Sequence, residues 1–199
     1  ADLTEPDGLA AVEGRLRDPH APVELLVNNA GMSLNRSFLR SSAADEERLL
    51  RLNVVAVMRL TLAALPGMVD RRRGAVINVS SAAGFGPVMP GSTYPATKAW
   101  VNNFTESVAP TVRASGVRVM AVCPGFVRTE FHERAGIDMS WAPRWIWLDA
   151  DAVAAAALRG LARGKVLSVV DWRYRVAVGL MRVLPRGIVR AVTRDTRGH

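Results

Sequence analysis

The sequence predicts an α/β protein built on a doubly wound parallel sheet, and two patterns along its 199 residues support this fold class. Short apolar runs that suit strands alternate with longer helical stretches. The runs are almost continuously apolar, as expected for parallel strands that helices cover on both faces. Strands joined through helices in this way imply right-handed crossovers within one sheet.

The expected strands are short and are bounded by polar residues or by proline and glycine. They lie at residues 24–28, 75–80, 117–123 and 166–170. Pro124 and Gly125 end the third strand, because proline has no backbone N–H to donate to a ladder hydrogen bond.

The expected helices begin near hydroxyl or acidic residues, which are typical of helix N-termini. They cover residues 42–71, residues 92–114 and a stretch that ends at residue 163. Ser42 or Asp45 lies near the start of the first helix, and Asp149 or Asp151 can cap the last one.

The net charge of +8 is concentrated in a basic amphipathic tail, residues 171–199, which follows a single domain at residues 1–170. The tail has seven arginines against Asp171 and Asp195, so seven minus two gives +5 of the +8. No zinc-finger, helix-turn-helix or aromatic-basic motif accompanies it, so we expect no nucleic-acid partner. Its alternating arginines and apolar residues leave two interpretations: a helix packed on this protein or on a partner subunit, or peripheral contact with an anionic membrane.

The cysteine count and the N-terminal composition bear on the compartment. The only cysteine, Cys123, excludes a disulfide framework and suits a reducing environment. No signal peptide is visible, and no apolar run reaches about 18 uninterrupted residues. The histidines have no metal-ligand spacing. We therefore expect a cytoplasmic protein without a metal, or one held at a membrane surface by its tail.

Tyr94 and Lys98 are the residues whose chemistry is clearest. They are four residues apart and so share one face of a helix, which allows Lys98 to lie beneath the phenol. Lowering the pKa of a phenol from near 10 to near 7 requires roughly 4 kcal/mol. An ammonium about 4 Å away, at an effective dielectric of ~20, supplies roughly that much. Ser81 lies thirteen positions before Tyr94, at the end of a strand. Such a trio can move a proton to or from a carbinol oxygen while a cofactor moves the hydride.

Five motifs, in this order and at these spacings, resemble the short-chain dehydrogenase/reductase family. They are Asn28-Asn29-Ala30-Gly31, Leu52-Asn53-Val54, Ile77-Asn78-Val79-Ser80-Ser81, Tyr94-x-x-x-Lys98 and Cys123-Pro124-Gly125-Phe126-Val127-Arg128-Thr129. The resemblance covers about residues 1–165 and implies a Rossmann-like fold. The family's T-G-x-x-x-G-x-G turn does not occur in the sequence, and residues 1–4 resemble the end of the family's third strand. We therefore expect an N-terminally truncated sheet that lacks the first two strands and most of the third.

The resemblance assigns four catalytic residues, Asn53, Ser81, Tyr94 and Lys98. Tyr94 acts as general acid/base, and Lys98 also binds the nicotinamide ribose. Ser81 orients the substrate oxygen, since the family's serine-to-tyrosine spacing selects it over Ser80. The family bends a helix at the position of Asn53, where the residue holds a water in a proton relay. A capped or solvent-facing amide is the alternative for Asn53.

The cofactor implied by the resemblance is NADP or NAD, with NADP favoured because relatives with an apolar lid favour it. The expected cofactor contacts are Asp2, Leu3, Asn28, Ala30, Gly31, Tyr94, Lys98, Pro124, Gly125, Val127 and Thr129. Those after the third strand lie at the carboxyl edge of the sheet, where doubly wound folds bind ligands.

The substrate is expected to be a small hydrophobic alcohol or ketone, because residues 130–148, the family's variable lid, are rich in aromatic and aliphatic side chains. The expected substrate contacts are Ser81, Phe85, Met89, Tyr94, Trp141 and Trp145. The lid residues could instead pack a subunit interface, and a homo-oligomer is expected.

The sequence therefore predicts an NAD(P)-dependent oxidoreductase that transfers a hydride to or from a carbonyl or secondary alcohol. The alternative, since the glycine-rich phosphate turn is not in the sequence, is a non-catalytic or interaction protein that no longer binds a dinucleotide.

Overall fold

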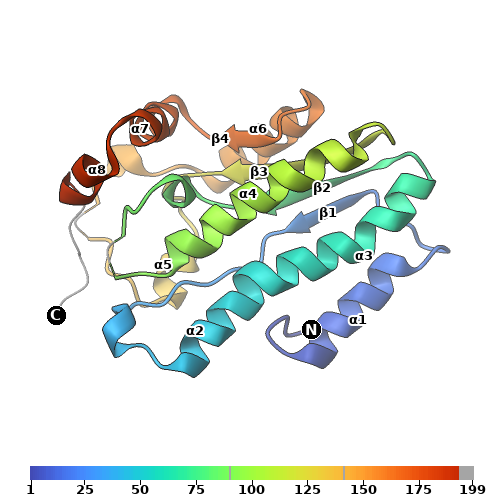
Figure 1. The fold of residues 1–199 in the computed structure, drawn as a ribbon, viewed down its shortest axis with the longest axis horizontal. Helices are drawn as coiled ribbons and strands as arrows, with labels where there is room; N and C mark the ends of the chain where they lie inside the picture. Colours follow the sequence, from blue (N-terminus) through green and yellow to red (C-terminus); the bar gives the residue numbers. More distant parts are fainter. Residues whose placement is uncertain (90, 141, 193–199) are drawn as a thin grey trace.

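A four-stranded parallel sheet forms the centre of the molecule in the computed structural model, which describes residues 1–89, 91–140 and 142–192 (Figure 1). The strand order is β1-β2-β3-β4 and all three pairings are parallel. The strands are β1 (Leu25–Asn28), β2 (Gly74–Val79), β3 (Val117–Cys123) and β4 (Leu167–Val169). The predicted fold class is confirmed, and each predicted strand agrees with an observed one within a residue at either end.

Helices cover both faces of the sheet, and alternate residues of β2 divide between the two cores. Val76 packs with the helices α1 (Pro6–Arg17), α3 (Ala56–Asp70) and α4 (Tyr94–Arg113). Ala75 and Ile77 face the other core, which includes residues of α6 (Ala150–Ala162). The prediction of strands covered on both sides is therefore confirmed. Figure 1 shows α1, α3 and α4 side by side along one face.

The predicted helix at 42–71 is present but is not regular throughout. It consists of α2 (Ala43–Leu50), a π-helical turn η2 (Arg51–Val55) and α3. Ser42 caps it by accepting a hydrogen bond from the Asp45 N–H at 3.1 Å. By length and composition alone, the stretch from Ala43 to Asp70 could cross a membrane. Its buried residues, however, pack in the core against the sheet and α1.

The predicted amphipathic tail begins as a helix that packs on the rest of the chain. This helix, α7 (Trp172–Val183), buries Val178 and contacts the turn η3 (Ala82–Phe85). After Pro185 the short helix α8 (Arg186–Val192) follows. Three further short elements connect the larger ones: η1 (Phe38–Arg40), α5 (Phe131–Arg134) and η4 (Arg144–Ile146).

Candidate active site

The two serines after β2 have different partners. The buried Ser80 hydroxyl donates to the Lys98 carbonyl at 3.0 Å and so ties the strand end to α4. Ser81 has an extended backbone and caps η3 by accepting from the Ala83 N–H at 3.1 Å. The side chain of Ser81 also lies close enough to the Tyr94 phenol to lower its pKa. The structure therefore places Ser81, rather than Ser80, beside the tyrosine.

Lys98 is buried at the second turn of α4, beneath the end of β2. Its ammonium donates to the Val79 carbonyl at 2.8 Å and lies 5.7 Å from the centre of the Tyr94 ring. Burial lowers the pKa of Lys98 to about 8, because the charged form loses its hydration. The residue thus titrates close to the physiological range, as a proton-relay group requires.

The pKa of Tyr94 differs from the expectation that Lys98 lowers it. Burial raises the pKa of the half-buried phenol to about 12, and the neighbouring Ser81 side chain offsets only part of this rise. The Phe131 ring lies 5.9 Å from the Tyr94 ring, centre to centre, and is one apolar group beside it. In this structure, burial therefore decides the direction of the shift, and the ammonium does not.

Asn53 is completely buried in the π-helical turn, which interrupts the regular helix at the position where the resemblance implied a bend. Its Oδ1 accepts from the Met32 N–H, and its Nδ2 donates to the Met32 carbonyl, both at 2.9 Å. The same Nδ2 donates to Thr97 Oγ1 at 3.1 Å, and Thr97 in turn donates to the Tyr94 carbonyl at 2.7 Å. The alternative of a solvent-facing amide for Asn53 is wrong.

Thr97 links Asn53 to the first turn of α4, and sequence reasoning missed it. The only available signal was its position one residue before Lys98, which gives it the same buried side of α4. Gly31 lies at the same place: a methyl group there would meet Asn53 Oδ1 at 3.4 Å and Lys98 Nζ at 3.5 Å. Two of the expected catalytic residues, Asn53 and Lys98, therefore lie around one expected cofactor residue, Gly31.

The side chain of Asn28 has a structural role. Its side-chain amide donates to Thr61 at 3.1 Å and to Asn78 at 2.9 Å. Asn78 donates onward to Thr105 at 2.9 Å. This buried chain fixes β1, β2 and the two helices beneath them. It uses only the Asn28 Nδ2, and among the described residues the buried Oδ1 has no hydrogen-bond partner, so this oxygen and the backbone remain for a cofactor contact.

A cavity of about 250 Å³ beside β1 brings together three of the expected cofactor residues, Leu3, Asn28 and Ala30. Its wall is mostly apolar, with Val27 and Leu52 among the lining residues. Asp2 lies next to it but holds a local turn, because its carboxylate accepts from the N–H and hydroxyl of Thr4.

The segment after β3 owes its conformation to a residue that the sequence analysis did not single out. The Tyr174 ring covers Gly125 so closely that a methyl group there would lie 1.8 Å from a ring carbon. The Tyr174 hydroxyl accepts from the Phe126 N–H at 3.1 Å and donates to the Ile146 carbonyl at 2.6 Å. No sequence signal relates positions 49 residues apart.

The neighbours of Gly125 are held in the same segment. Pro124 accepts from the Ala82 N–H at 2.8 Å, and Val127 forms a bridge with Leu148. Thr129 accepts from the Phe131 N–H at 3.3 Å and starts the segment that carries α5.

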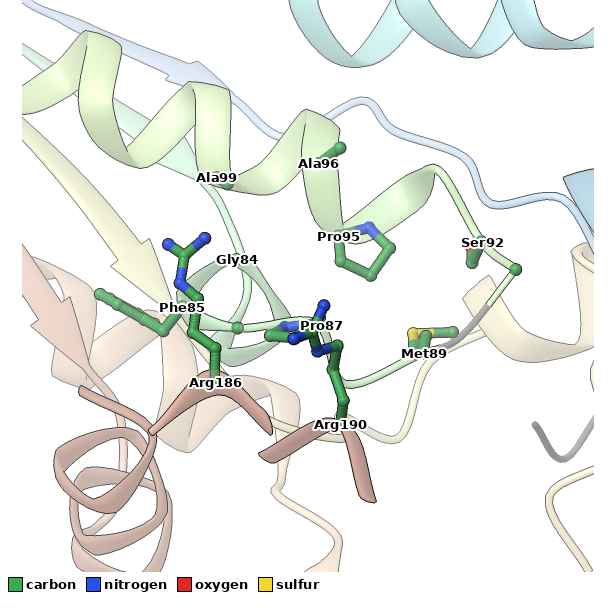
Figure 2. A pocket seen from close by; sticks show the side chains of 12 residues that line it. Gly84, Phe85, Pro87, Met89, Ser92, Pro95, Ala96, Ala99, Arg186 and Arg190 are labelled. Carbon is green, nitrogen blue, oxygen red and sulfur yellow. The ribbon is translucent and has the colours of Figure 1, made fainter. Parts of the chain in front are cut away.

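The expected substrate residues do not form one wall. Phe85 and Met89 line a cavity of about 450 Å³ (Figure 2), but Tyr94 and Ser81 are not among its described lining residues. Trp145 is 65% exposed. Trp141 lies outside the described residues.

An aromatic cluster that the sequence analysis did not assign begins beside Tyr94. Phe131 contacts Tyr94, and His132 lies 5.4 Å from Phe131, ring centre to ring centre. His132 also contacts Phe126 and Trp147 at 5.8 Å and 5.3 Å. Burial lowers the pKa of His132, so this cluster is an uncharged wall near neutral pH.

Comparison with known proteins identifies the family. A family model described as short chain dehydrogenase matches residues 1–139. Oxidoreductase UcpA of Escherichia coli K12 is 38% identical over 134 residues, which are 67% of this chain and 51% of that protein. The 3-oxoacyl-[acyl-carrier-protein] reductase FabG of Vibrio cholerae is 35% identical over 129 residues, 65% of this chain and 53% of that protein.

The chain thus spans about half the length of these curated relatives. A solved short-chain dehydrogenase from Sphingobium yanoikuyae, in complex with NADPH, superimposes with a TM-score of 0.81 at 35% identity. That comparison covers 100% of this chain and 76% of the other. The chain therefore belongs to the short-chain dehydrogenase/reductase family.

Proposed function

We propose that the protein is an NADP-dependent oxidoreductase that reduces a carbonyl, or oxidises a secondary alcohol, of a hydrophobic substrate. The observation that carries this proposal is that the Ser81 side chain lies beside the Tyr94 phenol, next to the buried Lys98. A hydroxyl and a phenol held together at the end of a parallel strand can bind one carbonyl oxygen between them.

Tyr94 is the proton donor in the direction of reduction. Its high pKa keeps the phenol protonated near neutral pH, which is the form that donation requires. The nicotinamide cofactor, when bound, supplies the hydride. Ser81 holds the substrate oxygen within reach of the phenol, so its contribution is orientation and hydrogen bonding to developing negative charge.

Lys98 and Asn53 position and resupply the proton donor. Lys98, with a pKa of about 8, exchanges a proton near physiological pH. Asn53 holds the first turns of α4 through Thr97 and the Tyr94 carbonyl. Loss of either residue is therefore expected to lower turnover without removing the phenol.

The described residues fit a nicotinamide cofactor at two places. Gly31 leaves open the space between Asn53 and Lys98, where a side chain would block approach. The apolar cavity beside β1, which Leu3 and Ala30 line, suits an adenine ring. The NADPH complex of the Sphingobium relative supports NADP as the cofactor. Val127 and Thr129 are proposed contacts on the nicotinamide side.

The substrate is proposed to be a ketone or 3-oxoacyl compound with a hydrophobic body. Phe131 beside Tyr94, and the uncharged cluster of His132 and Trp147 behind it, favour apolar over ionic substrates. The FabG relative is named as a 3-oxoacyl reductase, which supports an acyl ketone. We also propose a cytoplasmic homo-oligomer.

Isotope transfer tests this reaction. The complete gene product is incubated with NADPH deuterated at the nicotinamide C4 and a panel of aliphatic, aromatic and 3-oxoacyl ketones. We expect deuterium at the carbinol carbon of at least one hydrophobic product, and less transfer from NADH. A folded protein that binds NADPH and transfers deuterium to none of the panel contradicts the proposal.

A further inference from the structure

The cavity of about 450 Å³ is separate from the reacting groups. It lies between the segment that follows η3, the outer side of α4 and the helix α8 (Figure 2). Ala96 and Ala99 line it, and at about 100° per residue they lie roughly 200° and 140° around α4 from Tyr94. Lys98 instead points to Val79. The cavity therefore opens on the side of α4 away from the catalytic pair.

The wall of this cavity is apolar and its edge is cationic. Phe85, Met89 and Pro95 form part of the wall, and Arg186 and Arg190 form the edge. Figure 2 shows both arginine side chains extending from α8 toward the segment that carries Phe85. An apolar hollow of this size, with a small number of polar groups, lies within the range of ligand sites.

The positive charge at the edge belongs to an arginine-rich part of the sequence. Residues 172–192 contain five arginines and neither Asp nor Glu. Among the described residues, no ion pair involves Arg186. A third arginine, Arg182, lies 5.0 Å above the Phe85 ring and holds it against the helix.

We propose that this cavity binds an amphiphilic anion, an unbranched acyl chain that ends in a carboxylate or phosphate. The chain lies against Phe85, Met89 and Ala99, and the headgroup lies between Arg186 and Arg190. Guanidinium groups suit this role because they bind carboxylates and phosphates through two parallel hydrogen bonds. The site does not depend on the proposed reaction, because it uses neither Tyr94 nor Lys98.

Calorimetry with decanoate and decyl phosphate, both below their micelle-forming concentrations, tests the site on the complete gene product. We expect saturable binding of both anions and at least tenfold weaker binding of decanol. Arg186→Glu with Arg190→Glu should weaken anion binding at least tenfold. Arg159→Glu with Arg163→Glu, on two exposed arginines at the end of α6, makes the same change in net charge and should change nothing.

Filling the cavity provides a second test that does not change charge. Ala99→Phe at this exposed position should reduce the affinity for decanoate at least tenfold and leave the unfolding transition intact. Equal decanoate binding by wild type, the double arginine variant and Ala99→Phe would overturn the proposal.

Two further experiments distinguish a free anion from a membrane surface as the ligand, and the cavity site from the proposed reaction. Binding to phosphatidylglycerol vesicles without any binding of the monomeric anions would overturn the cavity site in favour of a membrane surface. Tyr94→Phe should keep full decanoate binding even if turnover is lost. A protein without turnover that still binds decanoate would contradict the proposed reaction alone.

Discussion

Lys98→Met should stabilise the protein near neutral pH, because it removes a buried charge. Burial lowers the pKa of Lys98 from 10.5 to about 8. At about 1.36 kcal/mol per pKa unit, the charged form destabilises the folded state by about 3 kcal/mol. Methionine fills a similar volume without the charge, but it leaves the Val79 carbonyl without its donor, which costs about 1–3 kcal/mol. The net gain is about 1–2 kcal/mol at pH 7.

The stability difference between wild type and Lys98→Met should depend on pH in a definite direction. Between pH 8 and 10.5 the unfolded state binds more protons at this lysine than the folded state does, so its contribution to stability rises with pH. Wild type should therefore gain about 2 kcal/mol relative to Lys98→Met between pH 7 and pH 9.5. Tyr94 and Cys123, whose pKa values burial raises to about 12, act in the opposite direction but are present in both proteins.

Urea unfolding followed by circular dichroism at pH 7.0, 8.5 and 9.5 measures the difference between the two proteins. We expect Lys98→Met to be the more stable at pH 7 and its advantage to shrink as the pH rises. A constant difference, or one that grows with pH, would refute the assignment of a depressed pKa to Lys98.

Three further substitutions have expected outcomes. Gly125→Ala should lower the free energy of unfolding by about 1–3 kcal/mol, because the new methyl group would collide with the Tyr174 ring. In a double-mutant cycle, Gly125→Ala should cost much less in a Tyr174→Ala background, and additive effects of the two substitutions would contradict the contact. Asn53→Leu should lower the free energy of unfolding by about 3 kcal/mol, because it leaves the backbone N–H and carbonyl of Met32 unpaired. Thermal unfolding measures this loss, and a change of less than about 0.5 kcal/mol would argue against these hydrogen bonds. Ser81→Ala should lower turnover more than Ser80→Ala does, as measured by steady-state kinetics. Ser80→Ala should lower the melting temperature more than Ser81→Ala does, as measured by calorimetry. The reverse pattern would exchange the roles of the two serines.

The sheet could be predicted from sequence because each strand is a local pattern. The run at 117–123 coincides with β3, since buried parallel strands need no partner to be recognised. Helix α1 was missed because its apolar face is weakly marked, although Pro6 at its start and Asp7 in its first turn are helix-start signals in the sequence. Its stability comes instead from contacts, including Glu13, which pairs with Arg59 at 2.5 Å.

Only those residues of the candidate site that belong to sequence motifs could be predicted. Tyr94, Lys98 and Ser81 follow from spacing and resemblance, and the structure brings them together. The direction of the Tyr94 pKa could not be predicted, because it depends on how the fold buries the ring. The Tyr174 contact with Gly125 is equally invisible, since no local pattern links residues so far apart.

Turnover of Tyr94→Phe, with cofactor affinity measured in parallel, tests the central claim most directly. The chain has only two tyrosines, so Tyr174→Phe is the matched control that removes a phenol hydroxyl from a structural position. We expect Tyr94→Phe to lower kcat at least a thousandfold with an unchanged Kd for NADPH, since the ring remains and the proton donor is lost. Tyr174→Phe should lower kcat far less than Tyr94→Phe does, because its hydroxyl only positions the backbone at Phe126 and Ile146. A Tyr94→Phe variant that turns over within a few-fold of wild type would contradict the account.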